Sequence, residues 1–277
     1  MTLPAYVTAS AVLHAAAGAA VLFAPGVWPW ALGAVGANHL VLTGGGLWPR
    51  SRWLGRNWTR LPEVAAARRE IAITIDDGPD PEVTPAVLDL LDAHQARATF
   101  FAIASVAVRH PALCHEIVRR GHSVQNHSDR HSRAFSLLGP RGLRREIESA
   151  QARLADLVGV APRFFRAPAG LRNPLLAPVL ERLGLELVSW TRRGYDTVRT
   201  EPSTVLARLC DGLDAGDILL LHDGHAARTA TGQPVVLAVL PALLERTARA
   251  GLRPTTLVDA LPAPHRTEAE PLAAASR

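Results

Sequence analysis

The chain has 277 residues, of which 48% are hydrophobic and 20% charged, values that suit a folded protein and exclude a disordered one. Its formal net charge is +5, and every basic residue apart from the histidines is Arg, because the sequence contains no Lys. No Arg-rich run alternates with aromatic residues as in a nucleic-acid groove, so we expect no nucleic-acid partner. The two cysteines, Cys114 and Cys210, lie in amphipathic helical patterns and are predicted to be inert thiols.

The first sixty residues contain two apolar runs without Asp, Glu or Arg, residues 5–24 and 26–48. Each has about 20 residues, enough to cross a hydrocarbon core of roughly 30 Å as a helix. We therefore predict that residues 1–60 form a membrane-anchoring helical hairpin, inserted through residues 5–48, in the inner membrane of a bacterial cell. A buried helical pair and a signal peptide are the alternatives, and the absence of a basic residue before the first run disfavours the signal peptide. For Asn38 and His39 we favour an interfacial or helix-pairing role over a functional one.

Four arginines follow the second apolar run directly, at positions 50, 52, 56 and 60. Basic residues next to a span tend to stay in the cytoplasm. If both runs span the membrane, the remainder of the chain lies on the cytoplasmic side; if only one does, it lies outside. The sequence favours the first arrangement.

From residue 61 onwards, short apolar runs alternate with helical patterns. Strands are expected at 71–75, 98–103, 122–126, 163–166, 185–190, 218–222 and 253–258, and helices at 84–94, 111–120, 140–158, 174–183, 204–213 and 235–250. Alternating strands and helices imply an α/β fold with a parallel sheet. About seven such units predict an incomplete (β/α) barrel over residues 61–262, and the Pro- and Ala-rich residues 263–277 are predicted to be a disordered tail.

Chemistry in a (β/α) barrel gathers where the strands end. The first strand ends in Asp76 and Asp77, adjacent acids that point to different sides, so that one can bind a cation while the other accepts a proton. The third is followed by His127 and His131, which at a spacing of four would share a helix face and suit Zn²⁺. Asp77 completes a three-ligand set with open positions, which is typical of a catalytic metal site.

Three further polar residues follow later strands. Arg166 ends the fourth strand and can hold a neighbouring carboxylate in its ionised form. Asp196 follows the fifth strand and is uninformative by itself. His222 comes directly after four apolar residues of the sixth strand, which places it at the barrel mouth.

Together these residues resemble the NodB-like polysaccharide deacetylases, the fourth family of carbohydrate esterases. The resemblance covers residues 70–260 and rests on Thr-x-Asp-Asp-Gly-Pro, His-Ser-x-x-His, Arg-x-Pro-x-Gly, a later Asp and Leu-x-His, in that order. It implies an incomplete (β/α) barrel and a divalent metal, usually Zn²⁺. It also implies a metal-dependent hydrolase that removes an N-acyl group from an amino sugar.

The resemblance further implies a role for each matching residue. Asp77, His127 and His131 would bind the metal, and Asp76 would be the general base. His222 would be the general acid, and Arg166 and Asp196 would orient Asp76 and His222. The sequence departs from the family pattern where Ile75 replaces a common Phe, Ala169 an aromatic residue and Thr197 a frequent Trp.

Two other functions compete with a deacetylase. A glycosidase needs two carboxyl groups about 5–9.5 Å apart, which adjacent acids and a His pair fit less well than metal chemistry. A catalytically inactive, membrane-anchored carbohydrate-binding module would have lost a ligand or the base, and neither is lost. As partner we expect an N-acetylated glycan or a lipid-linked amino sugar, and a cytoplasmic barrel would favour the lipid-linked sugar.

Overall fold

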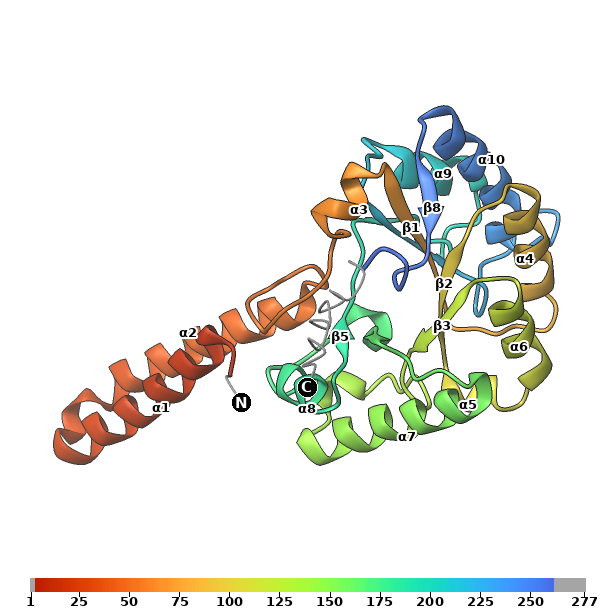
Figure 1. The fold of residues 1–277 in the computed structure, drawn as a ribbon. Coiled ribbons are helices and arrows are strands. Elements are labelled where there is room, and N and C mark those ends of the chain that lie inside the picture. The colour runs from red at the N-terminus through yellow and green to blue at the C-terminus, as the bar shows by residue number, and fades with distance from the viewer. Residues whose placement is uncertain (1–2, 262–277) are drawn as a thin grey trace, which may run out of the picture.

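A computed structural model describes residues 3–261. Eight strands form one sheet whose ladders are all parallel, in the order β5-β4-β3-β2-β1-β7-β6, with β8 paired to the start of β1. The sheet curls into an incomplete barrel with helices outside it (Figure 1). The strands are β1 Glu70–Asp76, β2 Ala98–Ala102, β3 Ser123–Asn126, β4 Phe164–Phe165, β5 Glu186–Leu187, β6 Arg192–Arg193, β7 Ile218–His222 and β8 Arg253–Thr255.

The chain passes through a helix between most pairs of successive strands, as a parallel sheet requires. Those of the barrel are α3 Glu63–Ala67, α4 Thr84–Ala93, α5 Ala104–Ala107, α6 Pro111–Arg119, α7 Pro140–Val158, α8 Leu176–Arg182, α9 Pro202–Cys210 and α10 Val235–Arg249. Short 3₁₀ turns occur at Pro25–Val27, Phe135–Leu137 and Pro168–Gly170.

The central strand β1 explains why this sequence forms a barrel with chemistry at one end. Ile71, Ile73 and Ile75 are fully buried under α4 and α10 in the outer hydrophobic layer. Because successive side chains of a strand point to opposite faces, the residues between them face the barrel interior. Ala72 belongs to the inner apolar cluster, whereas Asp76 ends the same face at the carboxyl edge of the strand.

The gap in the barrel lies between β5 and β6, which no ladder joins within residues 3–261. The segment of residues 57–61 runs through this gap. The amide of Trp58 donates to the carbonyl of Leu187 at 2.9 Å, and the carbonyl of Trp58 accepts from the amide of Ser189 at 2.8 Å. Arg60 Nη1 contacts Asp217 Oδ1 at 2.5 Å beside β7. Residues 57–60, which we assigned to the membrane hairpin, therefore contact β5 on one side of the barrel opening and Asp217 on the other.

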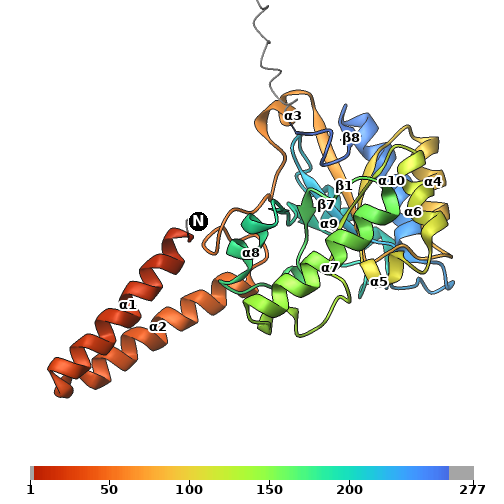
Figure 2. The same cartoon turned by 60° about the horizontal axis from the view of Figure 1, so that its bottom comes forward.

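The hairpin consists of α1 Ala5–Phe23 and α2 Trp28–Leu47, and it projects from the barrel in Figures 1 and 2. Asn38 Nδ2 donates to Ser10 Oγ at 2.7 Å, and His14 Nε2 lies 3.2 Å from His39 Nε2. Asn38 and His39 thus contact the partner helix. Among the described residues, α1 alone is long and apolar enough to cross a membrane. The second helix is less apolar because it contains several glycines besides these two polar residues.

The predicted fold class is confirmed for the barrel, which has three elements that we did not expect: β6, α3 and α5. The two-residue β6 is too short to leave a pattern in the sequence, so the sheet has eight strands where we expected seven. Helices α3 and α5 were not expected either. The predicted tail at 263–277 lies outside the described residues.

Candidate active site

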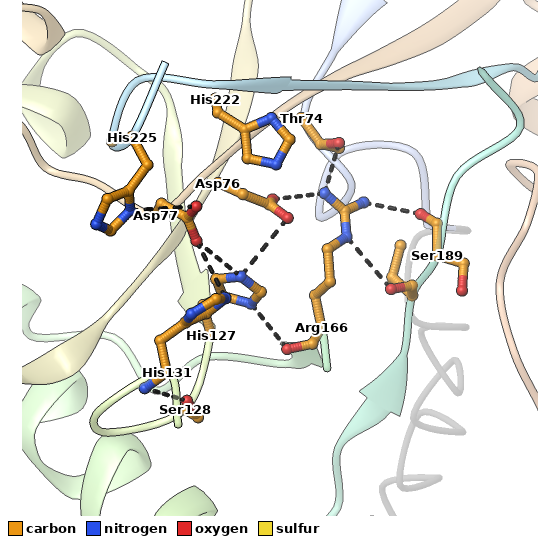
Figure 3. A network of polar contacts seen from close by, with 12 residues as sticks. Thr74, Asp76, Asp77, His127, Ser128, His131, Arg166, Ser189, His222 and His225 are labelled. Atoms are coloured by element: carbon orange, nitrogen blue, oxygen red, sulfur yellow. Dashed lines mark hydrogen bonds and ion pairs between the residues drawn. The ribbon is translucent and has the colours of Figure 1, made fainter. Parts of the chain in front are cut away.

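The pairing of β1 with β7 brings two predicted site residues together. In that parallel ladder Asp76 is the register partner of His222, so both side chains leave the sheet at the same edge. His127 follows β3 and Arg166 follows β4, two strands on the other side of β1. The carboxyl ends of four strands therefore converge on one site (Figure 3).

The carboxylate of Asp76 is buried and held on one side only. Arg166 Nη1 donates to Asp76 Oδ1 at 2.6 Å and to Thr74 Oγ1 at 2.7 Å, while Nη2 donates to the carbonyl of Ser189 at 2.8 Å. The guanidinium also stacks over the Phe101 ring, with Cζ 4.1 Å from the ring centroid. Arg166 thus holds Asp76 in one orientation. The other carboxylate oxygen, Oδ2, lies 3.7 Å from His127 Nε2 and faces the histidines.

Three side chains meet in a geometry that suits a divalent cation. The ligand atoms of Asp77, His127 and His131 all lie within 4.8 Å of one another. Asp77 Oδ1 is 3.2 Å from His127 Nε2 and 3.3 Å from His131 Nε2, yet it is buried and has no hydrogen-bond partner among the described residues. A buried acceptor that faces two ring nitrogens without a hydrogen bond is the arrangement expected of ligands that share a cation.

The orientation of His127 supports the same reading. Its Nδ1 lies 2.9 Å from the carbonyl oxygen of Arg166, which can only accept, so Nδ1 carries the proton. In the neutral ring the lone pair is therefore on Nε2, the atom that faces Asp77. A backbone carbonyl that fixes the tautomer in this way is the usual outer partner of a metal-ligating histidine.

The expectation that His127 and His131 share a helix face is wrong. Both lie in the loop after β3, and this loop contains two residues with positive φ, Ser128 at 66° and His131 at 51°. Its turns are closed by side chains: Ser128 N donates to Asn126 Oδ1, and His131 N donates to Ser128 Oγ. The rings still approach to 4.8 Å between centroids, because the loop folds back on itself.

His222 forms a pair with Asp196, a residue that carried little information in the sequence. His222 Nδ1 lies 2.9 Å from Asp196 Oδ1, and the amide of His222 donates to Asp196 Oδ2 at 2.7 Å. Asp196 is fully buried, and each of its two carboxylate oxygens contacts His222. Nδ1 is thereby the proton-bearing atom, and Nε2 is left for the site.

Burial and neighbouring charges act against each other on these groups. Burial raises the pKa of Asp77, but His127 and the other imidazoles outweigh it, so the pKa lies well below its ordinary value and the carboxylate stays ionised. Burial lowers the pKa of His222, but Asp196 outweighs it, so the pKa is raised above its ordinary value. The protonated form of His222 is therefore favoured where a proton donor is needed.

Asp76, Asp77, His127, His131 and His222 line a pocket of about 650 Å³, a size typical of ligand sites. Ala169 and Thr197, two of the departures from the family pattern, are part of its wall. Sequence analysis missed His225, whose Nδ1 lies 3.5 Å from Asp77 Oδ2. It also missed Asp223, whose pKa burial raises to about 7 and which accepts from Thr84 Oγ1 at 2.5 Å. The His-Asp-Gly-His run that begins at the last residue of β7 was the available signal.

The family model for polysaccharide deacetylases matches residues 63–188. A chitooligosaccharide deacetylase of Azorhizobium caulinodans is 36% identical over 162 residues, which cover 58% of this chain and 77% of that protein. The chain belongs to the polysaccharide deacetylase family. A peptidoglycan-N-acetylglucosamine deacetylase of Bacillus cereus is 33% identical over 201 residues, covering 72% of this chain and 91% of that protein.

Solved structures of the family share the fold. A family 4 carbohydrate esterase from Streptomyces lividans, in complex with acetate, superposes with a TM-score of 0.60 at 29% identity. The match covers 67% of this chain and 91% of that one. Other curated relatives in the family are much longer, and the chain spans 36% of their length. The family model covers the barrel from α3 to β5, so the hairpin, Asp196 and His222 all lie outside it.

Proposed function

We propose that this chain is a metal-dependent carbohydrate N-deacetylase, which removes an N-acyl group, acetyl in the simplest case, from an amino sugar of a polysaccharide or glycolipid. The single observation that carries the proposal is the meeting of Asp77, His127 and His131 beside Asp76 and His222 in one pocket. The relatives named above, which act on chitooligosaccharide and peptidoglycan, support this reaction class.

The ligand set fits a divalent cation, with Zn²⁺ favoured by two imidazoles and one carboxylate. When bound there, the ion supplies a Lewis acid for the acyl carbonyl and lowers the pKa of water. Asp77 contributes the negative charge that the site needs, since its lowered pKa keeps it ionised. His127 contributes a nitrogen whose direction is fixed by the carbonyl of Arg166.

Asp76 is proposed as the general base. Its Oδ1 is held by Arg166, which leaves Oδ2 to accept a proton from the attacking water. Because Arg166 also bonds Thr74 and the carbonyl of Ser189, the carboxylate cannot rotate freely, and its orientation towards the site is set before substrate binds. Arg166 is a positioning residue in this scheme.

His222 is proposed as the general acid. An amine is a poor leaving group until it is protonated, so amide hydrolysis needs a second proton carrier. The Asp196 carboxylate favours the protonated imidazole and directs Nε2 towards the pocket. Asp76 and His222 then divide the work, with one group taking a proton and the other giving one.

We further propose that the hairpin inserts into the bacterial inner membrane through residues 5–48. Leu22, Phe23, Trp30 and Leu40 are largely exposed, and such side chains on a helix pair are satisfied by lipid. If α2 crosses the membrane together with α1, the arginines of residues 50–60 favour a barrel on the cytoplasmic side and a lipid-linked amino sugar as substrate. A topology reporter fused after Arg277 tests the side, and a periplasmic readout would contradict it.

The test of the reaction is release of acetate from N-acetylated sugars by the purified, zinc-loaded full-length chain. We expect turnover that a chelator abolishes and that added Zn²⁺ restores. A metal-loaded protein that binds such sugars but releases no acetate would favour the competing function, an inactive carbohydrate-binding module. Activity that survives complete removal of metal would exclude the metal-dependent mechanism.

A further inference from the structure

The pocket that holds the metal-binding set has an excess of positive charge at its wall. Arg109, Arg130, Arg133 and Arg193 all line it, while its carboxylates are Asp76 and Asp77, which the site already uses. A neutral acetylated sugar gives no reason for this excess. An arginine without an ion-pair partner is the one that can bind a ligand.

Arg130 is the one with partners. Its Nε lies 3.6 Å from Glu146 Oε1 and 3.7 Å from Asp129 Oδ2. For the other three, no carboxylate within residues 3–261 comes within ion-pair distance. Two of these, Arg109 and Arg133, are exposed at the rim, where solvent compensates an unpaired charge. The third, Arg193, is only partly exposed and is therefore the informative residue.

Arg193 is held inside the pocket by β6. Its register partner is Leu220 of β7, which also lines the pocket, whereas the neighbouring Arg192 points to the other face and contacts Asp217. The guanidinium stacks on two rings, with Cζ 5.3 Å from the centroid of Trp190 and 4.8 Å from that of Tyr195. Its Nε is buried and has no hydrogen-bond partner among the described residues.

The contrast with Arg166 defines what Arg193 lacks. Both guanidiniums lie over the Trp190 ring, but Arg166 donates to a carboxylate, a hydroxyl and two carbonyls. A buried guanidinium nitrogen without an acceptor is costly, and a planar fork presented to a pocket suits a carboxylate or a phosphate. A ligand that brings such a group would supply the missing acceptor.

We propose that the sugar deacetylated here carries an anionic group, a phosphate or a carboxylate, which Arg193 binds while Arg109 and Arg133 add electrostatic attraction at the rim. This inference rests on the proposed deacetylase function and names the substrate class of that site. The two sources of the anion are a phosphodiester that links the sugar to a lipid and a carboxylate within an acidic polysaccharide.

The test compares three substrates of the zinc-loaded full-length chain in detergent: neutral triacetylchitotriose, an alkyl phosphodiester of N-acetylglucosamine, and an acetylated oligosaccharide with a uronic acid. We expect kcat/KM for one anionic substrate to exceed the neutral value by about 10- to 100-fold, the worth of a hydrogen-bonded ion pair. The preferred substrate identifies the source of the anion. Its advantage should fall as salt rises, because the rim charges are screened.

Arg193→Gln should reduce the ratio of anionic to neutral kcat/KM by about tenfold or more, and Arg193→Lys should retain part of it. Arg208→Gln is the matched control, because Arg208 stacks on the same Tyr195 ring, 4.9 Å from its centroid, without lining the pocket. A ratio near one in the unmodified chain, or a ratio unchanged in Arg193→Gln, overturns the inference while the deacetylase function stands.

A binding measurement separates the two proposals if no acetate is released. Calorimetry on the full-length Asp76→Asn variant compares N-acetylglucosamine 1-phosphate with N-acetylglucosamine, and turnover is not needed. Tighter binding of the phosphate that is lost on adding Arg193→Gln supports the anionic site even where the deacetylase proposal has failed. Equal binding of the two sugars overturns it.

Discussion

The carboxyl edge of the barrel and the N-terminal hairpin differ in the side chains that they bury and expose. The edge buries polar groups, whereas the hairpin exposes apolar ones. At the edge, two buried polar groups each have a charged neighbour, Arg166 for Asp76 and Asp196 for His222. On the hairpin, large apolar side chains are exposed, and only 6% of the apolar window of α1 is buried. The chain itself pairs Asp76 and His222, whereas it leaves the large apolar side chains of the hairpin uncovered.

The same contrast predicts how sensitive each region is to substitution. A polar network in a buried site fails when one member is removed, because the others are left charged or unpaired. A substitution in a helix that contacts the barrel only at its base should have little effect on the site. The predictions that follow test this difference, beginning with the change that should do most.

Loss of a metal ligand should have the largest effect. In His127→Ala the cation loses one of three protein ligands, and we expect metal affinity and activity to fall by more than the 10- to 100-fold that an outer-shell partner is worth. Metal content after dialysis is the measurement. His94→Ala, an exposed histidine on the far end of α4, is the control and should keep its metal. Full occupancy in His127→Ala would remove this residue from the metal site.

Asp76→Asn should lower activity while leaving the metal in place. The amide has a similar volume but cannot take the proton, so we expect a loss of about 10²–10⁴-fold in kcat. Asp89→Asn, an exposed acid paired with Arg120, controls for the change of charge. Acetate release with metal analysis of the same samples is the readout. Near-normal turnover would mean that another group is the base.

Asp196→Asn should move the pH dependence rather than abolish activity. The Asp196 charge raises the pKa of His222, so the acid form persists to higher pH and activity falls as pH rises through that pKa. Removing the charge lowers the pKa, and the alkaline limb of kcat/KM should shift to lower pH by about one unit. The side-chain amide nitrogen also cannot accept from the amide of His222, so a modest loss of stability should accompany the shift. An unmoved alkaline limb would contradict the role of His222 as acid.

The parts of this picture that the sequence predicted share a physical basis. The strand before Asp76 is a fully buried run, and buried runs are readable because their composition is dictated by the core. The four buried apolar residues before His222 likewise indicated a strand, and its position at the end of that strand placed it at the barrel mouth. Such patterns can be recognised in the sequence because they do not depend on the conformation of the loops.

The missed parts depend on backbone geometry or on distant contacts. The positive φ of Ser128 and His131 leaves no hydrophobic period, so a spacing of four was mistaken for a helix turn. Trp58 pairs with Val188, directly after β5, which is a contact across 130 residues. No sequence pattern in residues 49–61 predicts it. Arg193 was not singled out in the sequence, because the two-residue strand β6 that directs it into the pocket leaves no pattern there.

The smallest effect on the barrel should come from removing the hairpin at the right place, and this locates the boundary that the sequence put at residue 60. Gly45 and Gly46 are buried at the base of α2, where a Cβ on Gly46 would lie 2.3 Å from the carbonyl oxygen of Arg172. The carbonyl of Gly46 accepts from the amide of Arg172 at 3.2 Å.

The contacts continue beyond α2 into the wall of the active-site pocket. Ser189 Oγ donates to the carbonyl of Pro49 at 2.5 Å, and Pro49 packs against Gly170. Removal of residues 1–44 keeps all of these contacts, so we expect a barrel that no longer sediments with membranes. Its kcat/KM on a small soluble acetyl-sugar should stay within about twofold of the full chain, since distant sites act independently.

Removal of residues 1–60 is the matched comparison, because it also takes away the segment that fills the gap between β5 and β6. Three backbone hydrogen bonds and the Arg60–Asp217 pair are affected, and buried partners are left unsatisfied at about 1–3 kcal/mol each. We expect the shorter protein to melt several degrees lower and to lose activity with its fold. If the two truncated proteins have equal melting temperatures and activities, residues 49–60 belong to the hairpin after all and the barrel closes without them.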